Sequence, residues 1–295
     1  MRDDKTMKLI IIGGTGLLGQ ALKKEAVRRK IQTITVARKN ADRCLDITND
    51  KELTAFLIQE KPDTVINACA IVNHKICEEN PSLAYCVNAR PNSVLAGLSR
   101  QCGFKFVYIS TDGYFHGDAR KKHDEKSPVR LLNEYARTKY LGEKLTELNP
   151  DALIVRTNIV GFRGNAEQPS FAEWAINALK NKEKMTLFDD YYTSSISVAQ
   201  FSKALFDLLE HNVSGLINLA SREVSSKKEF IETLADVFGL SAENATTGSV
   251  SRLSSSCRAD SLGLDVSRAE EILGYTLPDL HDVIFQLKKE YTNEQ

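Results

Sequence analysis

The 295-residue chain lacks an excess of charge of either sign and lacks long apolar runs. Its 39 Lys and Arg residues balance 39 Asp and Glu residues, which gives no support for binding to nucleic acid or to an anionic membrane. No apolar run approaches the ~20 residues of a transmembrane helix, and residues 1–7 are too polar for the core of a signal peptide. We therefore expect a cytoplasmic protein whose partners include neither nucleic acid nor a membrane.

Paired metal ligands and paired cysteines are also missing from the sequence. The six cysteines form no Cys-x-x-Cys pair, and the five histidines show no His-x-x-x-His or His-Glu-x-x-His spacing. The sequence therefore predicts no metal site. Several cysteines lie in apolar runs, so we expect reduced, buried thiols rather than disulfides.

Short apolar runs alternate with helical patterns through the first half of the chain. The runs are apolar throughout rather than alternating, which is typical of parallel strands with helices on both faces. Such an alternation predicts an α/β fold with a Rossmann-like doubly wound parallel sheet. The expected strands cover residues 8–12, 31–37, 63–68, 104–110 and 152–157, and the expected helices cover 17–30, 49–60, 81–102 and 134–148.

After residue 157 this rhythm weakens, and we expect a smaller C-terminal α/β substrate lobe. The predicted NAD(P)-binding domain covers residues 7–160, joined by part of 198–220. The predicted substrate-binding lobe covers 161–197 and 221–295. Its helices are expected over 171–180, 198–209, 227–238, 267–273 and 280–291, with a strand over 216–220 and an irregular segment over 241–258.

A glycine turn directly follows the first expected strand. Gly13, Gly16 and Gly19 are spaced by three residues, and the absence of side chains lets a pyrophosphate approach the backbone and the helix N-terminus. The alternative is a plain strand-to-helix turn. Because the motif opens a βαβ pattern, we interpret it as dinucleotide-binding. The residues expected at the cofactor are Gly13, Thr15, Gly16, Leu17, Leu18 and Gly19.

Arg38 follows the end of the second expected strand, and a basic residue there suits the 2′-phosphate of NADP(H). NADPH is therefore the predicted cofactor, with NADH as the alternative and a solvated loop arginine as the competing interpretation. Asp46 would accept a hydrogen bond from the adenine amino group, or would cap the helix beginning near Asn49. The other positions expected at the cofactor are Ile47, Ala68, Cys69 and Ala70.

Tyr135 and Lys139 are four residues apart in a helical pattern, which places both side chains on one face. A phenol has an ordinary pKa of about 10, and a neighbouring ammonium lowers that pKa toward the range useful for acid–base catalysis. The alternative is an amphipathic pair on a surface helix.

Several motifs occur in a fixed order along the chain. The glycine turn is followed by Asn67-Ala68-Cys69-Ala70, Ser110-Thr111-Asp112, Tyr135-x-x-x-Lys139, Arg156-Thr157-Asn158 and Ser261-Leu262-Gly263-Leu264-Asp265. In this order the chain resembles the extended short-chain dehydrogenase/reductase superfamily. Within it, the chain most resembles the dTDP-4-dehydrorhamnose reductase-like, sugar-nucleotide-binding branch.

This resemblance implies hydride transfer from NADPH to the C4 ketone of a nucleotide-activated 4-keto-deoxysugar. Thr111, Tyr135 and Lys139 would form the catalytic triad, with Ser110 as the alternative hydroxyl. Tyr135 and Lys139 would also contact the cofactor. The implied partner is a small-molecule nucleotide sugar in polysaccharide biosynthesis, and a homodimer is compatible with the sequence. The residues expected at the substrate are Ser110, Asp112, Tyr114, Asn158 and Arg258.

The chain departs from the branch at Gly113, where a tyrosine is usual, so Tyr114 either compensates or simply packs. Two other functions stay open at this point. One is a sugar-nucleotide epimerase with tightly held NAD(P), and the other is a non-catalytic, NADP(H)-binding regulatory subunit. A dehydratase is disfavoured, because Gly113 stands where a dehydratase carries a glutamate after Thr111-Asp112.

Overall fold

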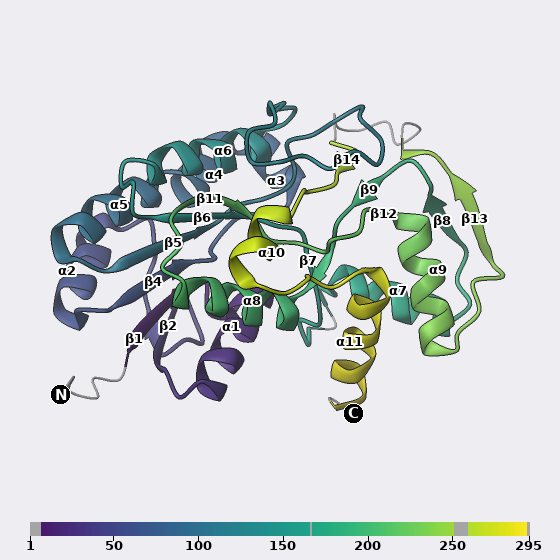
Figure 1. Ribbon diagram of the computed structural model, residues 1–295, viewed down its shortest axis with the longest axis horizontal. Coiled ribbons are helices and arrows are strands. Elements are labelled where there is room, and N and C mark those ends of the chain that lie inside the picture. The colour runs from purple at the N-terminus through teal and green to yellow at the C-terminus, as the bar shows by residue number, and fades with distance from the viewer. Residues whose placement is uncertain (1–6, 166, 251–258, 294–295) are drawn as a thin grey trace. The chain divides into compact units, whose positions relative to one another are not determined.

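The computed structural model describes residues 7–165, 167–250 and 259–293, which fall into two compact units (Figure 1). The first unit is formed by Met1–Thr111, Asn133–Val155 and Asn212–Ile217. The second unit is formed by Asp112–Leu132, Arg156–His211 and Asn218–Gln295.

The first unit is built on a seven-stranded sheet in the order β11-β6-β5-β4-β1-β2-β3. All strand pairs among β1 to β6 run parallel, as the apolar strands predict. The strands are β1 (Lys8–Ile12), β2 (Gln32–Ala37), β3 (Arg43–Cys44), β4 (Thr64–Asn67), β5 (Lys105–Ile109), β6 (Leu153–Arg156) and β11 (Gly215–Asn218).

Helices cover both faces of this sheet (Figure 1): α4, α5 and α6 lie on one face and α1 lies on the other. The expected single helix over 81–102 is wrong. It is divided at Ala89 into two helices, and Pro91 in the first turn of the second helix lacks the N–H that a continuous helix needs. The helices are α1 (Leu17–Arg28), α2 (Asp50–Glu60), α3 (His74–Glu79), α4 (Pro81–Asn88), α5 (Arg90–Cys102) and α6 (Glu134–Thr146).

The second unit combines helices with three small sheets. Its core is formed by apolar side chains of α7 (Phe171–Lys180), α9 (Lys227–Phe238) and α11 (Leu280–Asn293). The remaining helices are α8 (Val198–Glu210) and α10 (Ser267–Leu273). The small sheets pair β7 (Ile159–Val160) with β10 (Ile196–Ser197), β8 (Met185–Phe188) with β13 (Ala245–Gly248), and β9 (Tyr192–Thr193) with β12 (Ser225–Ser226) and β14 (Ser261–Leu262).

Strand β13 corrects the expectation that residues 241–258 are irregular. Ala245–Gly248 pairs in parallel with β8 along its whole length. Its sequence, Ala-Thr-Thr-Gly, is too polar to give a hydrophobic strand signal, so backbone pairing rather than side-chain burial defines it. Residues 251–258 lie outside the described part of the chain.

The described thiols differ in burial. Cys77 is buried, whereas Cys44 and Cys102 are exposed, so expected burial is wrong for these two. Both lie at the ends of elements, where local apolar content does not ensure coverage. Cys257 lies outside the described residues. Within the described ranges, no helix has both the length and the hydropathy to cross a bilayer.

Candidate active site

The turn between β1 and α1 brings the chain very close to the segment after β4. A Cβ added to Gly13, which has φ of +85°, would lie 2.8 Å from the backbone nitrogen of Cys69. A Cβ on Gly19 would lie 2.2 Å from the carbonyl oxygen of Gly13. Both positions therefore require glycine, because backbone atoms cannot give way as a flexible side chain can.

Thr15 and Gly16 lie at the exposed tip of the same turn. Gly16 is the N-cap of α1 and supplies no side-chain hydrogen bond to the first turn of the helix. Backbone amides there can meet a pyrophosphate, which fits a dinucleotide. Leu18 and Gly19, also expected at the cofactor, are buried and pack behind the turn; Leu17 is partly exposed.

The end of β2 presents Arg38 to solvent. The described part of the chain offers its guanidinium no hydrogen bond or close ion pair, so it can meet a phosphate group.

Asp46 is exposed and accepts hydrogen bonds from Thr48 at 2.9 Å (backbone N) and 2.8 Å (Oγ1), which hold the pKa of Asp46 below its usual range. The cap of α2 is Asn49, whose Oδ1 accepts from Glu52 N at 3.3 Å, so Asp46 as the cap is wrong. Ile47 is buried.

Asparagine side chains hold the segment after β4 that contains Ala68, Cys69 and Ala70. Asn67 Oδ1 accepts from Cys69 N at 3.1 Å. Asn88 Oδ1 accepts from Ile71 N at 2.7 Å, and Asn88 Nδ2 donates to Ile71 O at 3.1 Å. The three expected cofactor residues are partly exposed on this fixed backbone.

Helix α6 carries Tyr135 and Lys139 one turn apart, and Asn133 caps it by accepting from Ala136 N at 2.8 Å. Lys139 is only 3% exposed, so the alternative of a surface pair is wrong. Its Nζ donates to the carbonyl oxygen of Ile109 at 2.7 Å, which joins the helix to the end of β5, two residues before Thr111. The ring of His74 lies 5.0 Å from the ring of Tyr135.

The two neighbouring hydroxyl residues Ser110 and Thr111 differ in a hydrogen bond that Ser110 makes to α6. Ser110 Oγ donates to Glu143 Oε1 at 2.6 Å, and both residues are buried. The Ser110 hydroxyl thus already has an acceptor on α6. This favours Thr111, which is also buried, as the candidate hydroxyl.

Glu143 is a residue that the sequence reasoning missed. It lies one turn beyond Lys139 on the same face of α6, and the spacing Tyr135, Lys139, Glu143 was the available signal. Burial lowers the pKa of Lys139 to about 7, and the negative charge of Glu143 acts in the opposite direction. Burial, with Glu143 adding to it, raises the pKa of Tyr108 well above its ordinary value; the Tyr108 ring lies 4.2 Å from Lys139 Nζ. The ammonium is thus held between a neutral ring, a carbonyl and a buried carboxylate.

The second unit contains three of the expected substrate residues. Asp112 is buried, and its Oδ2 accepts from Asn158 Nδ2 at 2.7 Å. Asn158 Oδ1 in turn accepts from Ser195 Oγ at 2.7 Å. Tyr114 has no exposed surface and packs under the guanidinium of Arg156 at 5.0 Å, so packing, not compensation for Gly113, is its observed role. Arg258 lies outside the described residues.

Comparison with known proteins agrees with this arrangement. Residues 7–292 match the family described as "RmlD substrate binding domain". The "probable low-salt glycan biosynthesis reductase Agl14" of Haloferax volcanii is 29% identical over 255 residues, with 84% of each chain covered. The "dTDP-4-keto-6-deoxy-D-glucose reductase" of Streptomyces niveus is 28% identical, with 72% of each chain covered.

A solved structure gives the same result for the fold. The dTDP-4-dehydrorhamnose reductase of Bacillus anthracis, crystallised in complex with NADP, superposes with a TM-score of 0.87 at 25% identity, covering 98% of this chain and 99% of that one. The Rossmann-like sheet with a smaller second lobe and the resemblance drawn from the motifs are both confirmed. The chain belongs to the RmlD substrate-binding domain family and is an NAD(P)-dependent reductase of nucleotide sugars.

Proposed function

We propose that the protein uses NADPH to reduce the C4 ketone of a nucleotide-activated 4-keto-deoxysugar. The observation that carries the proposal is the bond between Lys139 Nζ and the Ile109 carbonyl. This bond joins the helix that carries Tyr135 and Lys139 to the strand end that continues into Thr111, which supports a role for all three residues in one site. The names of the Streptomyces and Bacillus relatives support the 4-keto substrate class, and the NADP in the Bacillus structure supports the cofactor.

In the proposed reaction Tyr135 donates a proton to the ketone oxygen as that oxygen gains negative charge. Thr111 donates a hydrogen bond to the same oxygen. Lys139 favours the ionised form of Tyr135 after the proton has left, and it binds the nicotinamide ribose. Bound NADPH supplies the hydride. The balance is one ketone, one NADPH and one proton giving one secondary alcohol and one NADP⁺, with solvent returning the proton to Tyr135.

The test is Tyr135→Phe, with Tyr140→Phe as the matched control on the same helix. We expect Tyr135→Phe to lose at least 100-fold in turnover, the lower end of general acid catalysis, while NADPH binding is kept. The measurement is NADPH oxidation with dTDP-, UDP-, GDP- and CDP-linked 4-keto sugars. Unchanged turnover in Tyr135→Phe would exclude this assignment. A product formed without net NADPH consumption would identify an epimerase instead, and NADPH binding without turnover on any sugar would identify a regulatory subunit.

The cofactor is tested separately through Arg38→Ala, with the neighbouring exposed Lys39→Ala as control. A charge-assisted hydrogen bond contributes about 1.5–3 kcal/mol, so we expect the KM for NADPH to rise roughly 10- to 100-fold while the KM for NADH stays constant. Equal effects on both cofactors would show that Arg38 does not meet the 2′-phosphate.

A further inference from the structure

Lys227, the first residue of α9, has an ammonium group surrounded by aromatic rings. Its Nζ lies 4.4 Å from the centre of the Phe171 ring, 5.7 Å from that of Phe230 and 5.9 Å from that of Tyr191. These rings come from α7, from α9 itself and from the segment before β9. The backbone is fixed as well, because Lys227 N donates to Tyr191 O at 2.9 Å.

Aromatic faces attract a cation, but they do not accept the three hydrogen bonds that an ammonium can donate. Among the described residues, no oxygen accepts a hydrogen bond from Lys227 Nζ and no carboxylate lies within ion-pair distance. Other lysines of the second unit do find such partners: Lys203 Nζ donates to Asp207 at 2.7 Å, and Lys288 Nζ donates to Val237 O at 2.7 Å. Lys227 is therefore held without the acceptors that its charge normally requires.

Lys227 is partly exposed, yet its surroundings disfavour the charged form of the side chain. Burial lowers the pKa of Lys227 to about 8, against the opposing effect of Asp112, so the group stays largely protonated at neutral pH. The acceptor capacity of Asp112 is already shared with Asn158. Asp112 is also the residue that follows Thr111 in the chain.

Arginine side chains of the second unit pair with groups of the protein. Arg222 pairs with Asp279 at 2.9 Å, and Arg163 Nη1 donates to Gln168 O at 3.4 Å. Arg120 pairs with Glu229 at 2.6 Å. These cations have acceptors already, whereas Lys227 does not.

We propose that Lys227 is a binding site for the diphosphate of the nucleotide-sugar substrate. The identification of the anion rests on the proposed function, because the diphosphate carries the negative charge of such a substrate. Phosphate oxygens supply the acceptors that the aromatic rings lack, and they reach an ammonium that has already lost much of its hydration, which strengthens the attraction. Binding of the diphosphate to the Lys227 ammonium would then set the positions of the sugar and the base of the substrate.

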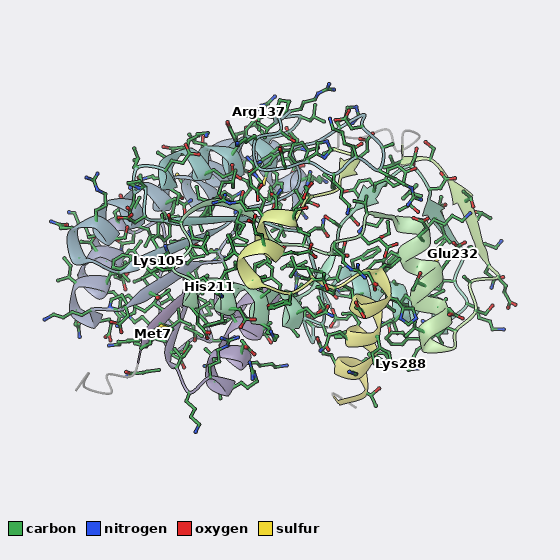
Figure 2. All side chains as sticks on the ribbon, in the orientation of Figure 1. Met7, Lys105, Arg137, His211, Glu232 and Lys288 are labelled. Atoms are coloured by element: carbon green, nitrogen blue, oxygen red, sulfur yellow. The ribbon has the colours of Figure 1, made fainter. Side chains whose placement is uncertain are left out.

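The experiment measures binding of dTDP, UDP, GDP and CDP by calorimetry to the full chain, to Lys227→Met and to Lys227→Arg. The matched control is Lys228→Met, because Lys228 is the next residue of α9 and its charge faces Glu232, labelled in Figure 2, at 3.9 Å. We expect Lys227→Met to weaken the best-bound nucleoside diphosphate roughly 10- to 100-fold, and Lys227→Arg to recover part of that loss. The affinities for the corresponding nucleoside and for NADPH should not change, and retained NADPH binding shows that the variant is folded.

The inference is overturned if folded Lys227→Met binds the nucleoside diphosphate as the wild type does, or if it weakens the nucleoside equally. It is also overturned if the wild type binds none of the four diphosphates. Its failure is separable from that of the proposed function. A Lys227-dependent diphosphate site without NADPH oxidation would leave this inference standing and remove the reductase assignment. NADPH-dependent turnover that is indifferent to Lys227 would do the reverse.

Discussion

Lys139 in the first unit and Lys227 in the second are both lysines whose pKa is lowered by burial, to about 7 and about 8. They differ in what surrounds the ammonium. Lys139 donates to a carbonyl and is influenced by the charge of the buried Glu143, whereas Lys227 faces three rings and is influenced by the charge of the buried Asp112. The protein itself supplies a hydrogen-bond acceptor for Lys139, whereas a ligand would have to supply one for Lys227. We therefore assign Lys139 to the positioning of catalytic atoms and Lys227 to the binding of the substrate diphosphate.

The largest effect should come from Lys139→Met. Without the ammonium, Tyr135 loses the charge that favours its ionised form, and helix α6 loses its bond to Ile109 O. We expect turnover to fall by roughly 100- to 10,000-fold, the range typical of an acid–base group. Lys227→Met should instead raise the KM for the nucleotide sugar far more than it lowers kcat. Steady-state kinetics of both variants test this difference between a catalytic and a binding lysine. A kcat loss in Lys227→Met as large as that in Lys139→Met would contradict it.

The next effect concerns Glu143. Lys139 must be protonated to act, so kcat/KM should fall as pH rises through its pKa of about 7. The negative charge of Glu143 raises that pKa, and Glu143→Gln removes the charge. We therefore expect the alkaline limb of kcat/KM to move to lower pH. Ser110→Ala is the control, because it removes the hydrogen bond to Glu143 but no charge. An alkaline limb that does not move in Glu143→Gln would show that Glu143 has no influence on Lys139.

A smaller effect is expected in the free energy of unfolding. Both lysines bind a proton less readily in the folded chain than in the unfolded chain, where the pKa is about 10.5. The unfolded state therefore binds more protons between each folded pKa and 10.5, and stability rises with pH across that window. For Lys139 the window opens at about pH 7, and for Lys227 at about pH 8. Urea unfolding at several pH values should show a rise that Lys139→Met and Lys227→Met each reduce, and a flat wild-type profile would contradict it.

The smallest expected effect is that of Asp112→Asn. The substitution keeps a side chain that can bond to Asn158 but removes the charge that opposes desolvation of Lys227. Nucleoside diphosphate binding at pH 7 should change by less than it does in Lys227→Met. The direction of this change in affinity depends on two opposing effects. Loss of the negative charge of Asp112 favours binding of the diphosphate anion, whereas a lower pKa of Lys227 disfavours that binding. Calorimetry at pH 6 isolates the first contribution, because Lys227 is then protonated in both proteins, and weaker binding at pH 6 would contradict repulsion by Asp112.

Local patterns predicted most of the fold. Helices 171–180, 227–238 and 267–273 were predicted residue for residue from their apolar spacing, and serine caps reinforce the start of the first two. The errors came from effects that spacing does not show. Pro91 divided an expected helix, and β13 is defined by backbone pairing with a strand about 60 residues away in the sequence.

The candidate residues with a regular sequence spacing could be predicted from the sequence. The burial and the hydrogen-bond partners of the side chains could not. Tyr135, Lys139 and the glycine turn were found from local motifs. That Ser110 faces Glu143, that Tyr114 is fully buried and that Lys227 lacks an acceptor depend on side chains that meet only in the folded chain. In the sequence Lys227 was only the first residue of an expected helix.

The strand end at β5 has a consequence for redesign of this protein. Tyr108 and Ser110 both meet α6, through Tyr108 Oη to the Lys139 carbonyl and Ser110 Oγ to Glu143. These two side chains are two residues apart, so they lie on the same side of an extended chain and together join the end of β5 to α6. Inserting one residue between Ile109 and Ser110 would turn the Ser110 hydroxyl away from Glu143 and remove half of that connection without altering either side chain.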